Sequence, residues 1–324
     1  MTMNFENTEL TNGTVPMDNM TNYPLRNFVN VVLVRELDSH AIFTTNGEDA
    51  DLTPLRVPFD GDKVLNYTPG MMFKRKQSGS DRRVAKAMQR DILDYEDTDT
   101  MKINEMNQRA VESVLYGSAA SSDDIDLGVE SRINYETAYS VRDASACVTS
   151  KFQNAPGDEY AKGSTSGIRE PEFFMPGTLF PSVVTLTDVT PAEAVFFLAM
   201  TQRNKRYGAS TSRLGRMKNH FVGIYVGSEE GPSNKDLVST IVREISAKTD
   251  QDPVEVVNGS LLGVEMVMDI CESVYDEACE RLTLDRLPED EEEELLDVAR
   301  SNDDLQQLLH EQEPHSREFI NDVV

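Results

Sequence analysis

The sequence has no tryptophan, three cysteines and four histidines, and these shortages exclude several kinds of site. Three cysteines without a paired pattern fit a reducing compartment and do not suggest a disulfide framework. Cys271 and Cys279, if they lie on one helix, are about 12 Å apart along its axis, which is too far to bridge. The histidines are scattered and show no metal-ligand spacing, so we expect no zinc site, no other metal and no cofactor.

Long apolar runs are absent as well. No stretch approaches the length of a membrane span, and residues 1–25 form a polar leader without the basic and apolar regions of a signal peptide. We therefore expect a cytoplasmic protein with no membrane partner. The sequence also lacks a phosphate-cradling glycine motif, a nucleophile elbow and a histidine-containing triad pattern, which argues against a small-molecule enzyme.

Positive charge is scarce, because 57 acidic residues stand against 31 lysines and arginines and the net charge is -26. Residues 251–324 alone hold 22 acids and four arginines. Such an acid excess is typical of proteins from halophilic archaea, where high salt screens the self-repulsion. We expect residues 283–324 to be a solvated acidic tail. Metal or basic-partner binding by Glu289 to Glu294 is the alternative interpretation.

Against this background, one window contains no acid at all. It runs from Ala194 to Ser228, where composition alone would place about six acids. Its cations fall close together around two glycines, and they are Arg203, Lys205, Arg206, Arg213, Arg216 and Lys218. Local positive charge in an acidic chain indicates a surface for phosphates, because the overall field repels a polyanion everywhere else. A structural loop that collected arginines is the alternative.

A second basic stretch contains seven cations and one acid, Asp81. Its cations are Lys74, Arg75, Lys76, Arg82, Arg83, Lys86 and Arg90. The spacing predicts a helix that begins at Asp81 with Ser80 as its cap, preceded by a flexible basic loop. Arg82, Lys86 and Arg90 recur every fourth residue and would lie on a cationic docking face, opposite a buried face of Val84, Met88 and Ile92. A common solvated basic helix face is the alternative.

The element pattern predicts an α+β fold. Residues 26–37 read as a buried strand and residues 178–188 as another. Thr190, Pro191 and Glu193 then supply an N-cap, a first-turn proline and a capping-box glutamate, so a helix should start at Pro191. A strand at residues 220–227 follows the basic glycine loop. This order of strand, helix, loop and strand is half of a ferredoxin-like unit.

Several segments resemble one known family. The most specific is RNKRYGASTSRLGRMKNHFVGI, supported by VVLVRELDSHAIFTTNGE, MMFKRKQSGSDRR, LYGSA and PGTLFPSVVTLTD. They are similar to the backbone subunit of type I-D CRISPR effector complexes, the Csc-type member of the Cas-seven family. The resemblance implies a modified RNA-recognition-motif palm over residues 26–282, with inserted peripheral domains. The insertions would be a basic helical one at about 70–118 and a thumb hairpin at about 148–176.

The resemblance, together with the charge pattern around Lys86 and Tyr207, suggests roles for particular residues. The expected RNA-binding side chains are Lys74, Arg75, Lys76, Arg82, Arg83, Lys86, Arg203, Lys205, Arg206, Tyr207, Arg213, Arg216 and Lys218. The expected thumb residues are Lys151, Phe152, Phe173 and Phe174. Tyr207 could stack on a base or instead cap a helix end, and the two phenylalanines could wedge between bases or pack within the hairpin. Some relatives bind zinc through a cysteine cluster, which this chain lacks.

The function implied is that of a non-catalytic scaffold that oligomerises along a CRISPR guide RNA. Its partners would be the guide RNA, the target DNA strand, copies of itself and other subunits of the complex. Phosphate contacts suit this role, because they bind any guide regardless of its sequence. One alternative is a target-strand nuclease on the same scaffold, with Asp38 as the candidate acid, although Asp38 and Ser39 also suit a turn. An unrelated single-stranded nucleic-acid-binding protein is the other.

Overall fold

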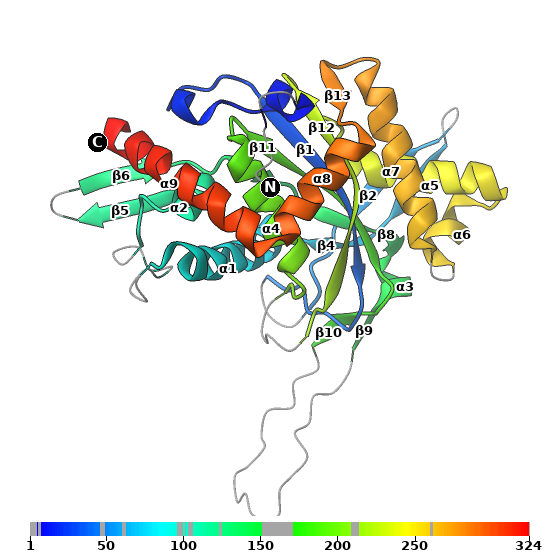
Figure 1. The fold of residues 1–324 in the computed structure, drawn as a ribbon. Helices are drawn as coiled ribbons and strands as arrows, with labels where there is room; N and C mark the ends of the chain where they lie inside the picture. Colours follow the sequence, from blue (N-terminus) through cyan, green and yellow to red (C-terminus); the bar gives the residue numbers. More distant parts are fainter. Residues whose placement is uncertain are drawn as a thin grey trace, which may run out of the picture.

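The computed structural model describes residues 5, 8–45, 49–59, 63–95, 100, 102, 106–122, 125–150, 171–208, 214–259 and 262–323. At its centre is an antiparallel sheet of five strands in the order β13-β12-β1-β11-β7 (Figure 1). Along the chain these strands are β1 (Phe28–Leu37), β7 (Ile133–Tyr135), β11 (Leu179–Thr187), β12 (Met217–Gly227) and β13 (Leu284–Arg286). Together with the helices, this sheet confirms the predicted α+β class.

β1 is the middle strand of the sheet because its sequence, FVNVVLVREL, is apolar on both faces. Val29, Val31 and Leu33 point into one core, and Val32 and Val34 into a second core on the other side. Strands buried on both faces read as continuous hydrophobic runs, which is how this strand was predicted.

Helices cover the first face of the sheet. The element α4 (Pro191–Arg203) lies against it, with nearly every residue from Pro191 to Thr201 buried. Thr190 accepts from the Glu193 amide, and the Glu193 carboxylate accepts from the Thr190 amide, which confirms the predicted capping box. Around α4 pack α1 (Lys74–Leu93), α2 (Val111–Tyr116), α8 (Glu289–Arg300) and α9 (Asn302–Val323).

The second face is covered by a different set of helices, as Figure 1 shows on the side away from α4. These are α5 (Asn234–Thr249), α6 (Pro253–Asn258) and α7 (Val264–Cys279). Tyr225 of β12 packs on Tyr275 of α7 with ring centroids 4.8 Å apart. The sheet is thus the middle layer of a three-layer arrangement, and its two cores are separate.

Smaller strand pairs and short helices complete the described fold. The pairs are β2 (Leu55–Pro58) with β3 (Val64–Tyr67), β4 (Pro69–Met72) with β8 (Ala138–Asp143), β5 (Ser118–Ser122) with β6 (Ile125–Val129), and β9 (Val148–Ser150) with β10 (Glu172–Phe174). The short helices are η2 (Glu9–Gly13), η3 (Met17–Asn19) and α3 (Ala144–Cys147). Within the described ranges, no helix is both long and apolar enough to cross a membrane.

The two ends of the described chain are packed, which differs from the predicted polar leader and acidic tail. Leu10 is buried in the first core, and the amides of Glu9 and Leu10 donate to the Glu291 carboxylate of α8, each at 2.9 Å. On α8 and α9 the buried residues are Leu295, Val298, Ala299, Leu305, Leu308 and Leu309. The C-terminal segment is therefore an amphipathic cover for α4, with Glu293, Glu294 and Asp297 exposed on its outer side.

The basic helix also differs from its prediction. The helix α1 begins at Lys74, so the stretch KRKQSGS is helical and Ser80 lies inside the helix. The segment has no proline, and it is held by tertiary contacts that local composition does not reveal: Gln77 donates to the carbonyls of Met72 and Glu136 at 2.9 and 2.8 Å. The predicted start at Asp81 and the predicted flexible loop are wrong.

Candidate nucleic-acid interface

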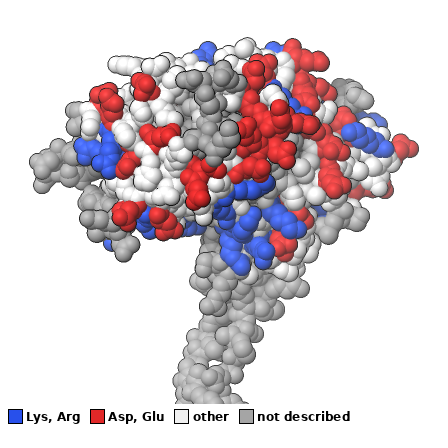
Figure 2. All heavy atoms as spheres, viewed as in Figure 1, with Lys and Arg blue, Asp and Glu red and all other residues white. Residues whose placement is uncertain are grey.

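Four exposed cations lie together where β12 begins. Tyr207 N donates to Gly215 O at 3.0 Å and Met217 N to Lys205 O at 3.0 Å, so the chain before and after the glycine loop runs side by side. These bonds gather Lys205, Arg206, Arg216 and Lys218, which we call the basic loop surface. Figure 2 shows Lys and Arg gathering in this part of the molecule, toward the β9–β10 end, while Asp and Glu form a band over the α8 and α7 side.

Carboxylates partly neutralise this surface. Arg216 Nε lies 3.0 Å from Asp38, and Lys218 Nζ lies 3.6 Å from Glu36 and 3.5 Å from Asp38. The side chains of Arg216 and Lys218 are 60% and 53% exposed, so these pairs are solvent-screened and weak. Glu36 and Asp38 therefore hold Arg216 and Lys218 only weakly, and both cations stay exposed to an approaching polyanion.

Two glycines make the turn of this loop possible. Gly208 has φ 119° and Gly215 has φ 74°, both in the region that disfavours other residues. A Cβ on Gly215 would lie 1.8 Å from the Tyr207 carbonyl oxygen. Any side chain there would push apart the two segments that carry the basic loop surface.

A buried polar network fixes the loop to α1. The Asp81 carboxylate accepts hydrogen bonds from Asn204 at 2.6 Å, Tyr207 at 2.8 Å and Tyr135 at 2.9 Å. The guanidinium of Arg35, on β1, lies 4.0 Å from the same carboxylate, and both side chains are fully buried. Removing one member of such a group leaves a buried charge without compensation, so the network is a rigid attachment.

The same network brings the two predicted basic segments together. Ser80 of α1 donates to the Arg206 carbonyl, and Asn204 Nδ2 donates to Ser80 Oγ at 3.0 Å. Lys76 and Arg83 lie one helical turn before and after Ser80, hence on the side of α1 that meets this loop. Lys76 is half-buried and Arg83 is exposed. The basic loop surface and this side of α1 therefore adjoin.

Tyr207 belongs to the network and not to the exposed surface. It is 3% exposed, its ring lies under Arg35 at 5.0 Å, and burial raises the pKa of its hydroxyl, which donates to Asp81. Its ring is inaccessible to a base, so the stacking prediction is corrected. It does not end α4 either, because Asn204 is the C-cap and donates its amide to Met200 O.

Two of the predicted cations on α1 have an internal partner. Lys86 is 1% exposed and lies 3.0 Å from Glu112 of α2, and Arg82 pairs with the same carboxylate. The predicted cationic docking face of the helix therefore points inward at these positions, because α2 supplies a buried acid that neutralises it. Lys86 is buried and cannot contact a phosphate, so its predicted role in RNA binding is wrong.

Arg203 is bound to the end of α8. Its guanidinium donates to the carbonyls of Ala299 and Arg300 and to Asn302 Oδ1, the last two at 3.0 Å. Partial burial lowers the pKa of this group. A cation on the last carbonyls of a helix satisfies orphan acceptors and opposes the helix dipole. Arg203 thus has a structural role at the junction of α4 and α8, and its contact with RNA stays a prediction.

The predicted thumb falls largely outside the described residues. Lys151 and Phe152 are among the residues that the structure does not describe, and so is Arg213 of the glycine loop. The described strands on either side of the thumb segment, β9 and β10, pair with one another. Phe173 and Phe174 of β10 are 4% and 0% exposed. Phe174 packs against Phe43 and Phe180, and Phe173 meets His40 edge-on, so neither is placed to wedge between bases.

Asp38 is the residue that the nuclease alternative requires, and its surroundings are described by the structure. Its carboxylate is one third exposed and contacts Arg216 and Lys218. Nearby, His220 Nε2 lies 2.9 Å from Glu36. Over the ranges that the structure describes, no three His, Cys, Asp or Glu side chains are arranged to hold a metal ion together. Asp38 therefore acts in this structure as the partner of two cations.

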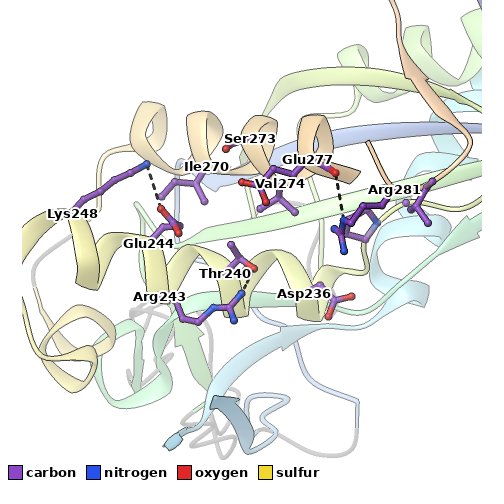
Figure 3. A pocket seen from close by; sticks show the side chains of 13 residues that line it. Asp236, Thr240, Arg243, Glu244, Lys248, Ile270, Ser273, Val274, Glu277 and Arg281 are labelled. Atoms are coloured by element: carbon purple, nitrogen blue, oxygen red, sulfur yellow. Dashed lines mark hydrogen bonds and ion pairs between the residues drawn. The ribbon is translucent and has the colours of Figure 1, made fainter. Parts of the chain in front are cut away.

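A groove between α5 and α7 offers a second concave site, with a volume of about 620 Å³. Figure 3 shows Arg243, Lys248 and Arg281 interleaved with Asp236, Glu244 and Glu277 along it. Lys248 lies 3.9 Å from Glu244. Because the two signs balance, this groove has no attraction for a polyanion comparable to that of the basic loop surface.

Sequence reasoning missed several residues of the interface. Asp81, Asn204 and Arg35 hold the loop, although none was predicted to take part. One signal was present, since Asp81 is the single acid among seven cations. A single acid among so many cations indicates that its carboxylate has a specific partner in the fold. Its hydrogen-bond partners lie 54 to 126 residues away, which no local pattern identifies.

Comparisons with known proteins identify a family and a shared fold. The family model described as Csc2 Crispr matches residues 17–309. The crystal structure of Thermofilum pendens Csc2 is similar over 95% of this chain and 92% of that chain, with 14% identity and a TM-score of 0.67. None of the curated protein sequences compared with the chain matches it.

Two further solved structures have lower scores. A chain of a type IV-B CRISPR complex is 16% identical and covers 60% of this chain and 90% of its own length, with a TM-score of 0.40. A chain of a CRISPR RNA-guided surveillance complex is 11% identical and covers 80% and 86%, with a TM-score of 0.48. Of these three structures, that of Thermofilum pendens Csc2 shows the shared fold.

Proposed function

The chain belongs to the Csc2 CRISPR family, and from that membership we propose that it is the backbone subunit of a type I-D CRISPR interference complex. It binds the guide RNA through its phosphates, repeats along the guide with copies of itself, and presents the guide to a target DNA strand. Other subunits of the complex complete the assembly.

The basic loop surface is the observation that carries this proposal. In a chain of net charge -26, four exposed cations are held together at the start of β12 by a glycine turn and a buried network. Arg and Lys contacts to phosphate supply affinity without reading bases. A guide-binding scaffold needs this kind of contact, because it must accept any spacer sequence.

The sheet topology supports an RNA-recognition-motif palm. The strands β12-β1-β11-β7 are mutually antiparallel neighbours, α1 lies between β1 and β7 in the chain, and α4 joins β11 to β12. This is the strand order and helix placement of a ferredoxin-like βαββαβ unit. In this chain α5 and α7 cover the face opposite α4, so nucleic acid has access to the ends and edges of the sheet.

The test is the salt dependence of RNA binding by a double variant, Lys205→Ala with Lys218→Ala. Each lost phosphate contact to a single strand lowers the slope of log affinity against log salt by about 0.7. We expect the double variant to bind a single-stranded uridine oligomer more weakly, with a slope smaller by about 1.4. Both positions are exposed, so the fold should be unchanged.

The matched control is Lys235→Ala with Lys248→Ala, which removes the same charge from exposed positions on α5. Its slope should equal that of the parent protein. Equal slopes for all three proteins would contradict the assignment of phosphates to the basic loop surface. The lengths of RNA that copurify with the parent protein separate a guide scaffold, which protects discrete lengths, from an unrelated single-stranded nucleic-acid-binding protein.

A further inference from the structure

A cavity of about 500 Å³ lies between the first turns of α1 and the edge strand β7. It is separate from the basic loop surface and from the groove between α5 and α7. Its size is within the range of small-ligand sites. The lining residues that matter here are Lys74, Arg75, Arg82, Tyr116, Asn134 and Tyr135.

The rim of the cavity is cationic. Lys74 and Arg75 are exposed on the first turn of α1, and neither has a hydrogen-bond or ion-pair partner within the described part of the chain. Arg82 also borders the cavity, but its charge is already paired with Glu112. Two uncommitted cations at the mouth favour an anionic group just outside the cavity, such as one phosphate.

The inner wall is aromatic. Tyr116 and Tyr135 are less than a tenth exposed, and their hydroxyls lie 3.2 Å apart. Tyr135 donates to Asp81, so the hydroxyls are committed to the buried network. The Arg82 guanidinium lies over the Tyr116 ring, 5.8 Å from its centroid, so the cavity is lined by this guanidinium and by the exposed edges of the two rings. Asn134 is exposed on β7, where its Nδ2 donates to Thr187 at 2.9 Å and its Oδ1 is left as an acceptor. The cavity thus combines ring surface with a polar group.

The cavity and the basic loop surface lie on opposite sides of the same helix. Lys74, Ser78 and Arg82 recur at four-residue spacing and face the cavity, whereas Lys76, Ser80 and Arg83 lie on the side that meets the loop. A strand held on the basic loop surface reaches the cavity by crossing α1, whose diameter is about 10–12 Å.

We propose that this cavity receives one unstacked base of the bound single strand, which stacks on the Arg82 guanidinium and contacts the tyrosine ring edges while Lys74 and Arg75 hold its phosphate. The inference rests on the proposed function, since it takes the ligand to be the strand that the basic loop surface binds. A base in such a site stacks without regard to its identity, so the cavity adds affinity and register without sequence preference.

The experiment compares two single-stranded probes of equal length, a uridine oligomer and the same sugar-phosphate chain without bases. The parent protein should bind the uridine oligomer about tenfold more tightly, the order expected for one stacked base. The variant Ser78→Trp, which fills the cavity from a half-buried position on α1, should bind both probes equally. The control Ser273→Trp, in the groove between α5 and α7, should keep the preference.

The possible outcomes separate the two proposals. Equal binding of both probes by the parent protein would overturn the cavity inference and leave phosphate binding intact. Binding of neither probe would overturn the proposed function and this inference with it.

A second measurement covers the case in which Ser78→Trp does not fold. The parent protein is irradiated with an oligomer that contains 4-thiouridine, and the crosslinked peptides are identified. Crosslinks at residues 131–135 are expected, and crosslinks confined to residues 205–218 would contradict the inference.

Discussion

At the scale of single residues, Glu292 has the most perturbed environment among the acids of α8. Its carboxylate accepts the Ile224 amide of β12 at 2.7 Å, and Arg286 lies 4.0 Å away. Burial raises its pKa to about 7 from an ordinary value of 4.5, despite the hydrogen bond and the arginine, which act in the other direction. The acid therefore binds a proton more tightly in the folded chain than in the unfolded chain.

This difference predicts a pH-dependent stability. Since the folded pKa is the higher one, the protonated group contributes stability that is fully present below pH 4.5 and is lost as the pH rises through about 7. Glu292→Gln keeps an acceptor for Ile224 without the charge. Between pH 4.5 and 8 the parent protein should lose about 1–2 kcal/mol of unfolding free energy relative to this variant, a value reduced for partial solvation.

The measurement is denaturant unfolding of both proteins across that pH range. Glu293→Gln is the control, because Glu293 is exposed on the same helix. A pH profile of Glu292→Gln that parallels the parent protein would show that this carboxyl does not titrate as described.

Asp81 shows why single residues are hard to assign from sequence. A serine followed by an aspartate ahead of an apolar pattern is a good local signal for a helix start. The structure instead uses Asp81 as a buried acceptor for Asn204, Tyr207 and Tyr135. Local capping chemistry and a long-range partner compete for the same side chain, and only the fold decides between them.

At the scale of elements, α8 and α9 are part of the first core, although their composition predicted a solvated tail. Thr190 at the start of α4 donates to Gln312 of α9 at 2.6 Å, and Arg203 at the end of α4 donates to the end of α8. The two helices therefore bind both ends of α4. Their apolar spacing was visible in the sequence at Leu305, Leu308 and Leu309, but the density of acids outweighed it in the interpretation.

Truncation after Pro288 should consequently destabilise the fold, because it exposes the core around α4. We expect the shortened chain to show no cooperative unfolding transition. A milder version is Leu305→Ala or Leu308→Ala, each of which should cost about 2–5 kcal/mol of unfolding free energy. Thermal and denaturant unfolding of the purified chains measure both effects.

Gln306→Ala is the control for these variants, since Gln306 is exposed between the two leucines. If the truncated chain unfolds cooperatively with the same unfolding midpoint as the parent protein, α8 and α9 are not needed for the stability of the fold.

Element prediction succeeded where local signals and tertiary packing agree. The capping box at Thr190 and the apolar run of β1 correspond closely to the observed helix and strand. It failed at α1, where glycine and serine suggested a loop while contacts from Gln77 and Ser80 hold a helix. In the interface, the positions of the exposed cations were predictable, whereas the network that supports them was not.

At the scale of the whole molecule, charge is segregated. Figure 2 shows the acids in a band over α8 and α7, apart from the cations near the start of β12. Repulsion from the acidic side and attraction at the basic side orient an approaching polyanion, and the effect weakens as salt screens it. Adaptation to high salt remains a prediction of composition.

The last prediction concerns Asp38, on which the scaffold and nuclease readings differ. In a scaffold, Asp38 only neutralises Arg216 and Lys218, so Asp38→Ala should free two cations and tighten RNA binding by up to about fivefold, as expected for an exposed ion pair. Glu36→Ala should act in the same direction, because Glu36 pairs with Lys218 and His220. A complementary strand should remain uncut by the parent protein and by both variants.

In a nuclease, the two acids are not equivalent. A carboxylate-bound divalent metal at each repeat would cut the complementary strand at regular spacing, and Asp38→Ala would lose cutting while Glu36→Ala kept it. The guide-loaded protein is incubated with complementary single-stranded DNA and RNA, first with magnesium and then with manganese. Evenly spaced products would overturn the scaffold reading, and products that persist in Asp38→Ala would show that another group binds the metal. Asp38 contacts Arg216 and Lys218, the two cations that we propose bind phosphate. The RNA affinity of Asp38→Ala therefore tests the phosphate contacts even if the complementary strand is cut.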